Sequence, residues 1–281
     1  MNGATGRVHT SYNQTVTSTG RLSSSNPNLQ NIPIKTDLGK KIREAFVPEE
    51  GSVMLAADYS QVELRLMAHL SGDELLLKSF ERGEDIHTRT AAEVFGIFPQ
   101  MVTPKMRREA KVINFGILYG MSGFGLSKEL GVSPRAASAY IEGYFSKYKG
   151  VKAFMESTVK SAKAKGYVST IMDRRCYLPD INSANGMQRQ FAERAAINAP
   201  LQGSAADVIK VAMVKIHRRL IAERLKSIMI MQVHDELVFE VPEGELDLMK
   251  RLVTEEMEGV VKLKAPLVVD IGVGKNWAEA H

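Results

Sequence analysis

Two aspartates in this 281-residue chain occupy positions where a carboxylate is costly. Asp58 ends the apolar run 53–57, and Asp235 interrupts the largely apolar segment 228–239. A carboxylate buried in a strand is destabilising unless a counter-charge neutralises it. One such residue could be a satisfied core acid. Two of them, far apart in sequence but alike in setting, predict a shared cation.

A second group of residues could bind a ligand of the same cation. Arg107, Lys111, Phe115 and Tyr119 recur every four residues, so on a helix they share one face. The two cations can hold phosphate oxygens, and the two aromatic rings offer flat surfaces for a base and a sugar. Taken alone, the same pattern also fits a basic surface turn followed by two core aromatics.

Acidic residues cluster around both aspartates. A strand that ends at Asp58 and turns directly into a helix places Asp58 at a sheet edge, with Glu63 in the first turns of that helix. Glu63 could equally be an ordinary surface acid. His234, Asp235 and Glu236 read as the tip of a β-hairpin. Carboxylates without soft ligands or a third nearby zinc ligand favour magnesium over zinc.

The sequence predicts both strands and helices as the elements that position these residues. The first 35 residues read as extended segments and turns, and residues 72 to about 185 read as helical. Within that stretch, Thr103-Pro104 and Ser133-Pro134 are helix starts, while Tyr167 to Tyr177 reads as a short β-excursion. We expect further strands at 53–58, 228–233, 237–241 and 267–273 and helices at 60–70, 188–225 (with a kink at Pro200) and 244–260. Strands at both ends with helices between them predict an α+β sheet domain interrupted by a helical subdomain.

Composition narrows the class of protein. An apolar content of 44% with 25% charged residues argues against global disorder. No apolar segment reaches signal or membrane-spanning length, which predicts a cytoplasmic protein without a membrane partner. Cys176 is the only cysteine, so no intramolecular disulfide or cysteine-cluster metal site can form. The net charge of +5 suits a polyanionic partner.

Five ordered motifs give the chain a specific resemblance. From about Thr5 to His281 it resembles the polymerase portion of family A DNA polymerases, the bacterial DNA polymerase I type. The motifs that carry the resemblance are 19–24 with 27–33, 58–65, 107–120, 194–203 and 233–236.

The resemblance implies a polymerase palm with an antiparallel sheet at 1–70 and 188–281, interrupted by helical fingers at 71–187. Because the chain begins almost at the palm, we expect the thumb and exonuclease domains to be absent and no proofreading. That expectation leaves room for a separate thumb or exonuclease polypeptide as a partner.

The resemblance also implies template-directed DNA synthesis from deoxynucleoside triphosphates (dNTPs) on primer-template DNA. Asp58 and Asp235 would hold two Mg²⁺ ions, for which Mn²⁺ can substitute, with the backbone carbonyl of Tyr59 as a further ligand. Glu236 would be an additional acid of the metal site. Lys111 would have a catalytic role in protonating the leaving pyrophosphate.

Further roles are carried over from the same motifs. Glu63 would be the steric gate that rejects a 2′-hydroxyl, and the Phe at position 115 implies discrimination against dideoxynucleotides. The residues expected to bind the incoming nucleotide are Arg107, Phe115, Tyr119, His87, Glu63 and Gln61. Those expected to contact DNA are Arg21, Asn28, Gln30, Asn31, Arg194, Asn198, Gln202 and His234.

Two alternatives stay open at this point. The chain could be a DNA-binding polymerase fragment, or one subunit of a split enzyme that needs a partner thumb for activity. It could also be related to single-subunit RNA polymerases, although Glu63 together with Tyr119 favours deoxyribonucleotides.

Overall fold

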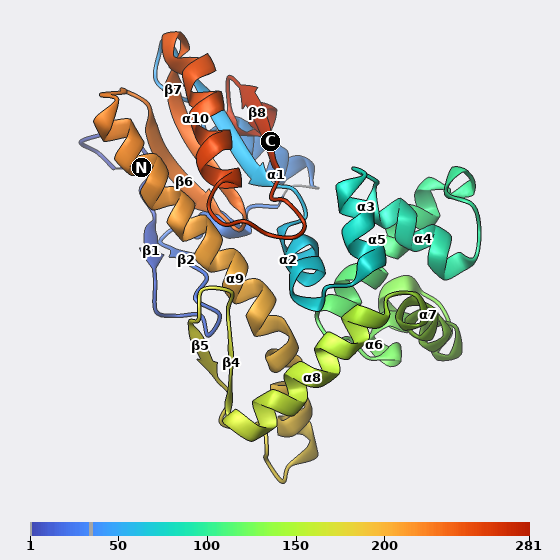
Figure 1. The fold of residues 1–281 in the computed structure, drawn as a ribbon. Helices are drawn as coiled ribbons and strands as arrows, with labels where there is room; N and C mark the ends of the chain where they lie inside the picture. The colour runs from blue at the N-terminus through green and yellow to red at the C-terminus, as the bar shows by residue number, and fades with distance from the viewer. Residues whose placement is uncertain (1, 34–35) are drawn as a thin grey trace. The chain divides into compact units, whose positions relative to one another are not determined.

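A four-stranded antiparallel sheet joins strands from the two ends of the chain (Figure 1). Its order is β6-β7-β3-β8, with β3 at Ser52–Tyr59, β6 at Ile228–Val233, β7 at Glu236–Pro242 and β8 at Val269–Gly274. The structure is a computed structural model and describes residues 2–33 and 36–281. All the expected strands of this sheet are present, and the α+β class is confirmed.

The chain divides by its internal contacts into two units. Met1–Val62, Ala205–Lys262 and Leu267–His281 form the first, here called the sheet unit, while Glu63–Ser204 and Leu263–Pro266 form the second, the helical unit. The division expected from the resemblance puts its boundaries at 70/71 and 187/188. The contacts put them after Val62 and after Ser204, because the helix that follows β3 and the first part of the long helix near 200 pack with helical-unit residues.

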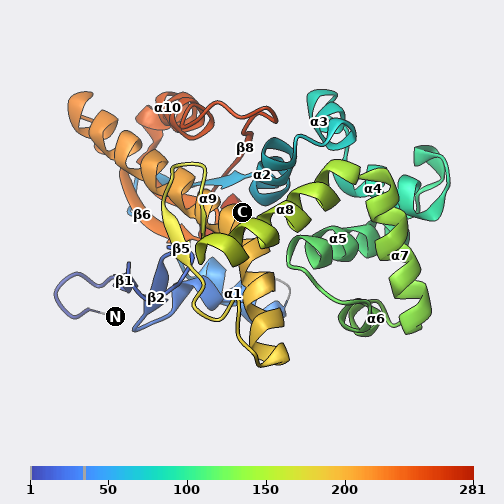
Figure 2. The ribbon, with the colours of Figure 1, turned by 60° about the horizontal axis from the view of Figure 1, so that its bottom comes forward.

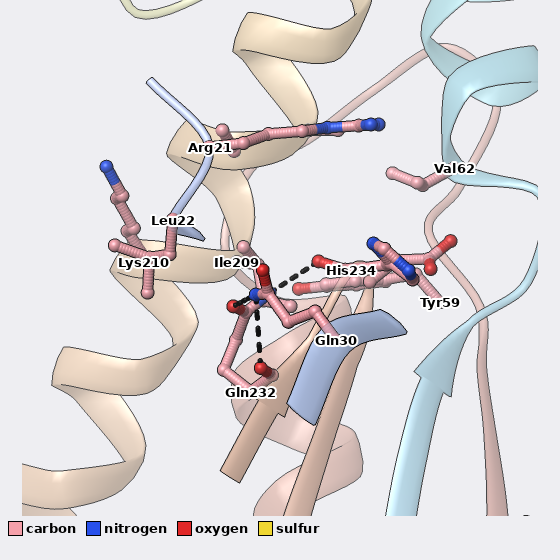
Figure 3. Close-up of a pocket in the computed structure, with 12 residues that line it drawn as sticks. Arg21, Leu22, Gln30, Tyr59, Val62, Ile209, Lys210, Gln232 and His234 are labelled. Atoms are coloured by element: carbon pink, nitrogen blue, oxygen red, sulfur yellow. Dashed lines mark hydrogen bonds between the residues drawn. The ribbon is translucent and has the colours of Figure 1, made fainter. Parts of the chain in front are cut away.

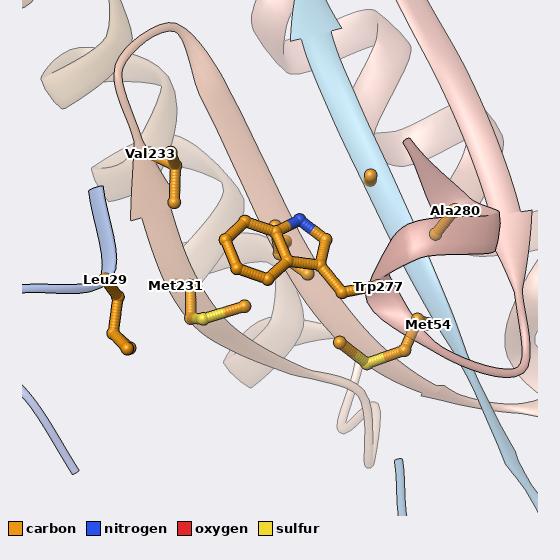
Figure 4. Packing of buried hydrophobic residues seen from close by; sticks show 8 residues of the cluster. Leu29, Met54, Met231, Val233, Trp277 and Ala280 are labelled. Atoms are coloured by element: carbon orange, nitrogen blue, oxygen red, sulfur yellow. The ribbon is translucent and has the colours of Figure 1, made fainter. Parts of the chain in front are cut away.

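Both faces of the sheet are buried, by different elements. Side chains alternate along β3, so Met54, Ala56 and Asp58 share one face. On that face Trp277 of α11 (Trp277–Ala280) packs into an apolar cluster with Met54, Ala56 and Met231 (Figure 4). On the other face, the Tyr59 hydroxyl donates to the carbonyl of Met257 in α10 (Leu246–Glu258) at 2.7 Å. Asp58 therefore lies at the end of the face that Trp277 covers.

The N-terminal segment of the sheet unit is extended, as expected. It contains β1 (Ser11–Asn13) paired with β2 (Ser23–Ser25), the short 3-10 helix η1 (Leu29–Asn31) and α1 (Asp37–Glu44). Tyr12 reaches the edge strand β6: its hydroxyl donates to the carbonyl of Gln232 and accepts from the Gln232 N–H, each at 2.9 Å. A second short 3-10 helix, η3 (Glu243–Glu245), joins β7 to α10.

The helical unit is built around α5 (Pro104–Leu118), which contacts α4, α6 and α7 (Figure 2). The Thr103 hydroxyl accepts from the Met106 N–H and the Ser133 hydroxyl accepts from the Ala136 N–H, so both expected helix starts are confirmed. The other elements of this unit before residue 166 are α2 (Val62–Ser71, which begins one residue before it), α3 (Glu74–Glu81), α4 (Ile86–Phe95), η2 (Pro99–Met101), α6 (Gly123–Leu130), α7 (Pro134–Lys147) and α8 (Lys149–Lys165).

The last part of the helical unit combines a hairpin with the first part of a long helix, up to Ser204. The expected β-excursion is the pair β4 (Tyr167–Ser169) and β5 (Arg175–Tyr177), and Cys176 is buried there. The helix α9 (Gly186–Ala222) continues through Pro200, whose carbonyl accepts a hydrogen bond from the Ser204 hydroxyl. Of the helices in the described residues, none has the length and apolar character needed to cross a membrane.

Candidate active site

The sheet unit brings Asp58 and Asp235 close together. Asp58 is the last residue but one of β3, and Asp235 lies in the two-residue turn between β6 and β7. The first residue of that turn, His234, has a positive φ of 56°, which closes the tight hairpin. The Tyr59 N–H donates to the carbonyl of Asp235 at 3.2 Å and so ties the turn to the strand.

Electrostatics make this carboxylate pair unfavourable on its own. Burial, followed by the negative charges of Asp235 and Glu236, raises the pKa of Asp58 to about 7. Burial also raises the pKa of Asp235, against the opposing charges of Arg21 and His234. The Asp58 Oδ1 atom is buried and has no hydrogen-bond partner within the described residues. A hard cation is the partner that such oxygens fit.

Glu236 is held by protein groups on the Trp277 face of the sheet. Its Oε1 accepts from the Trp277 indole N–H at 3.1 Å, and His281 Nδ1 lies 3.4 Å from the same oxygen. The guanidinium of Arg43 lies over the Trp277 ring at 3.9 Å. Glu236 faces Asp58 across the β3–β7 ladder, so these contacts fix an acid beside the carboxylate pair.

The metal roles of Glu236 and of the Tyr59 carbonyl stay predictions. The Tyr59 side chain points into the core, where its hydroxyl bonds to Met257, so only its backbone faces the turn that holds Asp235. Across residues 2–33 and 36–281, no group of three or more His, Cys, Asp or Glu side chains is arranged as a metal site. The fit to a cation therefore rests on the two aspartates.

A pocket next to Asp235 gathers several of the residues predicted to contact DNA (Figure 3). Arg21, Gln30 and His234 line it together with Asp235. The Gln30 amide donates to the Gln232 side chain at 3.0 Å, and the Gln232 amide donates to the His234 carbonyl at 2.5 Å. This relay connects the N-terminal segment to the turn, a link that the sequence pattern did not indicate.

Asn28 and Asn31 lie at the ends of η1 in the same segment. The Asn28 side chain accepts from the Gln30 N–H at 3.1 Å and caps η1, while both asparagines are exposed. Gln61 has a φ of 53°, and its Oε1 is buried without a partner among the described residues. Their contacts with DNA or nucleotide stay predictions.

In the helical unit, the predicted stripe forms one face of α5. Arg107 and Lys111 are exposed, while Phe115 and Tyr119 are half-buried with ring centroids 6.3 Å apart. His87 of α4 lies against this face, with its ring centroid 6.0 Å from that of Phe115. The structure thus gathers two cations, two aromatic rings and an imidazole. This set can hold phosphate oxygens at one end and a flat group at the other.

Arg107 has a partner that the sequence pattern did not indicate. Its Nη2 and Nε donate to Asp85 Oδ2 at 2.6 and 3.0 Å. Burial raises the pKa of Asp85, but the hydrogen bonds from Arg107 and Thr88 and the charge of Arg107 together outweigh it and lower that pKa overall. Asp85 also caps α4 by accepting from the Thr88 N–H at 2.7 Å. The cap position before Ile86 was a usable signal for that role, but the contact with Arg107 is tertiary.

Other predicted residues of the helical unit lie on two further helices. Glu63 is buried in the first turn of α2. Arg194, Asn198 and Gln202 share one face of α9, since the helix continues through Pro200. Arg194 is exposed beside Gly120, and Asn198 Oδ1 is buried without a partner within the described chain.

The environment of His87 predicts acid sensitivity. Burial, together with the positive charges of Arg107 and Lys111, lowers the pKa of His87 to about 4, against the opposing effect of Asp85. The unfolded chain therefore binds this proton more readily, so we expect His87 to reduce stability as the pH falls from about 6.5 to 4. Urea unfolding followed by circular dichroism should show that the free energy of unfolding falls less between pH 7.5 and 5 in His87→Gln than in the unmodified chain. An equal loss in both proteins would contradict this expectation.

Comparisons with known proteins agree with this geometry. Residues 1–279 match the model of DNA polymerase family A. The chain is 55% identical to the thermostable DNA polymerase I of Thermus filiformis over 98% of its own length and 33% of that protein. It is 54% identical to DNA polymerase I of Pseudomonas aeruginosa over 100% of its own length and 31% of that protein.

A solved structure is similar as well. The polymerase domain of Pol1 from M. smegmatis, in complex with DNA primer-template and dNTP, matches with a TM-score of 0.95 and 47% identity. The match covers 98% of this chain and 49% of that one. The chain thus spans about a third of the length of its curated relatives. From the motifs, the fold and these matches, the chain belongs to DNA polymerase family A.

Proposed function

We propose that this chain catalyses template-directed DNA synthesis, transferring a nucleotide from a dNTP to the 3′-hydroxyl of a DNA primer. The observation that carries the proposal is the Asp58–Asp235 pair, whose buried, unpartnered oxygen and raised pKa values suit a bound cation. The Pol1 structure with primer-template and dNTP supports the choice of substrates.

Asp58 and Asp235 would hold two Mg²⁺ ions, with Mn²⁺ as a substitute. When bound, the metal ions lower the pKa of the attacking hydroxyl and stabilise charge on the leaving pyrophosphate. The protein's own groups in the sheet unit hold the two carboxylates in fixed positions. The backbone contact from Tyr59 to Asp235 contributes to this, as do the groups that hold Glu236 beside Asp58.

The helical unit would bind the incoming nucleotide. Arg107 would exchange its contact with Asp85 for the triphosphate, since a guanidinium binds phosphate oxygens with the same paired N–H groups. Lys111, exposed one turn further along α5, would donate a proton to the leaving pyrophosphate. Phe115 would pack against the sugar and base.

Primer extension tests the proposal directly. A labelled primer annealed to a short template, with dNTPs and Mg²⁺ at low salt, should be extended by the unmodified chain and not by Asp235→Ala. Low salt is needed because phosphate contacts dominate the affinity for DNA and weaken steeply as salt rises. Absence of any extension by the unmodified chain would refute autonomous activity.

A DNA-binding fragment or split-enzyme subunit is the second candidate. The chain matches about a third of the length of its curated relatives, so the activity of those whole proteins is not carried over to it directly. In that case the unmodified chain should bind primer-template in a mobility-shift assay without extending it. The primer should then be extended only when the N-terminal remainder of a family A polymerase is supplied as a separate polypeptide.

The steric-gate assignment gives a separate prediction. Glu63 is buried at the start of α2, so Glu63→Ala removes a fixed side chain and opens the space where a 2′-hydroxyl would sit. We expect the preference for dNTPs over ribonucleotides to fall by roughly a hundredfold, as measured by single-nucleotide incorporation. Ready incorporation of ribonucleotides by the unmodified chain would instead indicate an RNA polymerase.

A further inference from the structure

A chain of hydrogen bonds runs through the core of the helical unit to His87. The Tyr148 hydroxyl lies 3.3 Å from Thr90 Oγ1, Thr90 Oγ1 lies 3.1 Å from Asn114 Oδ1, and Asn114 Nδ2 lies 3.0 Å from His87 Nδ1. The four residues are between 0% and 3% exposed, so water does not compete for these contacts. A fully enclosed chain of this kind fixes the direction in which each proton points.

Tyr148 sets that direction. Within the described residues, Thr90 is the only hydrogen-bond partner of its hydroxyl, and burial raises the pKa of Tyr148 to about 12, so the phenol keeps its proton. A buried O–H group that donates to nothing is destabilising, so Tyr148 must donate to Thr90. Thr90 then donates to the Asn114 oxygen, which leaves the Asn114 NH₂ group facing His87.

The opposite direction leaves a donor without an acceptor. If His87 Nδ1–H donated to the Asn114 oxygen, Asn114 would donate to Thr90 and Thr90 to Tyr148. The Tyr148 proton would then have no acceptor among the described residues. The core therefore selects one orientation of the Asn114 amide out of the two that fit the same space.

The orientation of Asn114 determines the chemical state of His87. A ring nitrogen that accepts from an amide carries no proton, so Nδ1 is bare and neutral His87 carries its proton on Nε2. The charged groups that act on the ring are Asp85 from the start of α4 and Arg107 and Lys111 from α5. Nε2 makes no hydrogen bond with any described residue, which leaves its N–H available to a ligand.

We propose that Asn114 is a positioning residue, held by Thr90 and Tyr148, that fixes His87 as the neutral Nε2–H tautomer. His87 thereby presents a hydrogen-bond donor to a phosphate oxygen of the incoming nucleotide. The phosphate part of this proposal rests on the proposed function, while the tautomer does not. Arg107 and Lys111 would supply the positive charge at the triphosphate. His87 would supply a hydrogen-bond donor that orients the phosphate oxygen.

Nuclear magnetic resonance of the histidine ring nitrogens tests the tautomer without reference to activity. In the unmodified chain at pH 7.5, the ¹⁵N shifts of His87 should show a protonated Nε2 and a bare Nδ1, with assignment by loss of the signals in His87→Gln. Asn114→Asp has nearly the same shape but replaces the donor with an acceptor. It should move the proton to Nδ1 and give His87 a titration above pH 6. A protonated Nδ1 in the unmodified chain, or an unchanged ring in Asn114→Asp, would overturn the proposal.

Nucleotide affinity tests the consequence. Calorimetric titration with dATP and Mg²⁺ should show roughly tenfold weaker binding to Asn114→Asp at high pH, where Nε2 is bare. Binding should partly recover at pH 6, where the ring is doubly protonated. The unmodified chain should not show this recovery, and a purely structural role of Asn114 would not produce it.

A double-mutant cycle separates positioning from a simple charge effect. If Asn114→Asp acts through His87, its effect on dATP affinity should largely disappear in the His87→Ala background. An effect of the same size in both backgrounds would overturn the positioning role. If the unmodified chain has the expected tautomer but does not bind dATP, the proposed function fails and the phosphate part of this inference fails with it. A wrong tautomer overturns the role of Asn114 whatever the activity.

Discussion

Replacement of Asp235 by asparagine is expected to reduce nucleotide incorporation by roughly a thousandfold or more, on the scale seen when a preorganised electrostatic group is lost. The change preserves the shape of the side chain and the backbone bond from Tyr59 to the Asp235 carbonyl. It removes one of the two negative charges that would hold the metal ions. Single-turnover extension of a primer by one nucleotide measures the effect, since it isolates chemistry from DNA release.

Asp270→Asn is the matched control for that experiment. Asp270 lies opposite Asp58 in the β3–β8 ladder but is exposed. The same loss of charge without a change of shape at this neighbouring position should leave incorporation within a few fold of the unmodified chain. Equal losses in the two variants would mean that general negative charge, and not the specific pair, supports activity.

Asp58→Asn is expected to abolish activity and yet stabilise the metal-free protein. The folded-state pKa of Asp58 is about 7, above its ordinary value of 3.8, so ionisation of this residue opposes folding. The penalty is absent below about pH 4, grows as the pH rises towards 7 and is complete above that. Because the Asp58 side chain is only half-buried, we expect Asp58→Asn to raise the free energy of unfolding by an amount on the order of 2 kcal/mol at pH 8. This is less than the full shift of the Asp58 pKa implies.

The single tryptophan makes this stability measurable in the sheet unit alone. Trp277 is the only tryptophan of the chain and is fully buried on the Asp58 face of the sheet. Urea unfolding followed by its fluorescence, in a chelator, should show the gain at pH 8 and little difference near pH 4. Mg²⁺ should stabilise the unmodified chain and not Asp58→Asn. No gain at pH 8, or stabilisation of both proteins by Mg²⁺, would contradict the assignment of Asp58.

The sequence predicted the parts of the site that depend on local pattern. Asp58 follows an apolar run and Asp235 breaks one, and both turn out to lie at one end of the sheet. The four-residue spacing of the α5 stripe is a property of any helix, so Arg107 and Lys111 could be placed on one face before the fold was known. The strands and helices also follow from periodicity and cap residues.

Tertiary partners could not be predicted in this way. Nothing near Glu236 in sequence indicates that Trp277 and His281 hold its carboxylate. The contact of Asp85 with Arg107 and the path from Tyr148 to His87 likewise join residues from different elements. A single sequence carries cues for periods and caps, but it carries no cue for which distant polar groups satisfy each other in a core.

The two hydrogen bonds of Tyr12 also cover part of the edge of the sheet. A strand at the end of a sheet exposes N–H and C=O groups on which a strand from another molecule can assemble. β6 is such a strand, and the Tyr12 hydroxyl occupies both backbone groups of Gln232 near its end. The register of β6 is also irregular between Met229 and Met231, which interrupts any regular template. The N-terminal segment therefore blocks strand addition at this end of β6, in addition to supplying residues to the pocket.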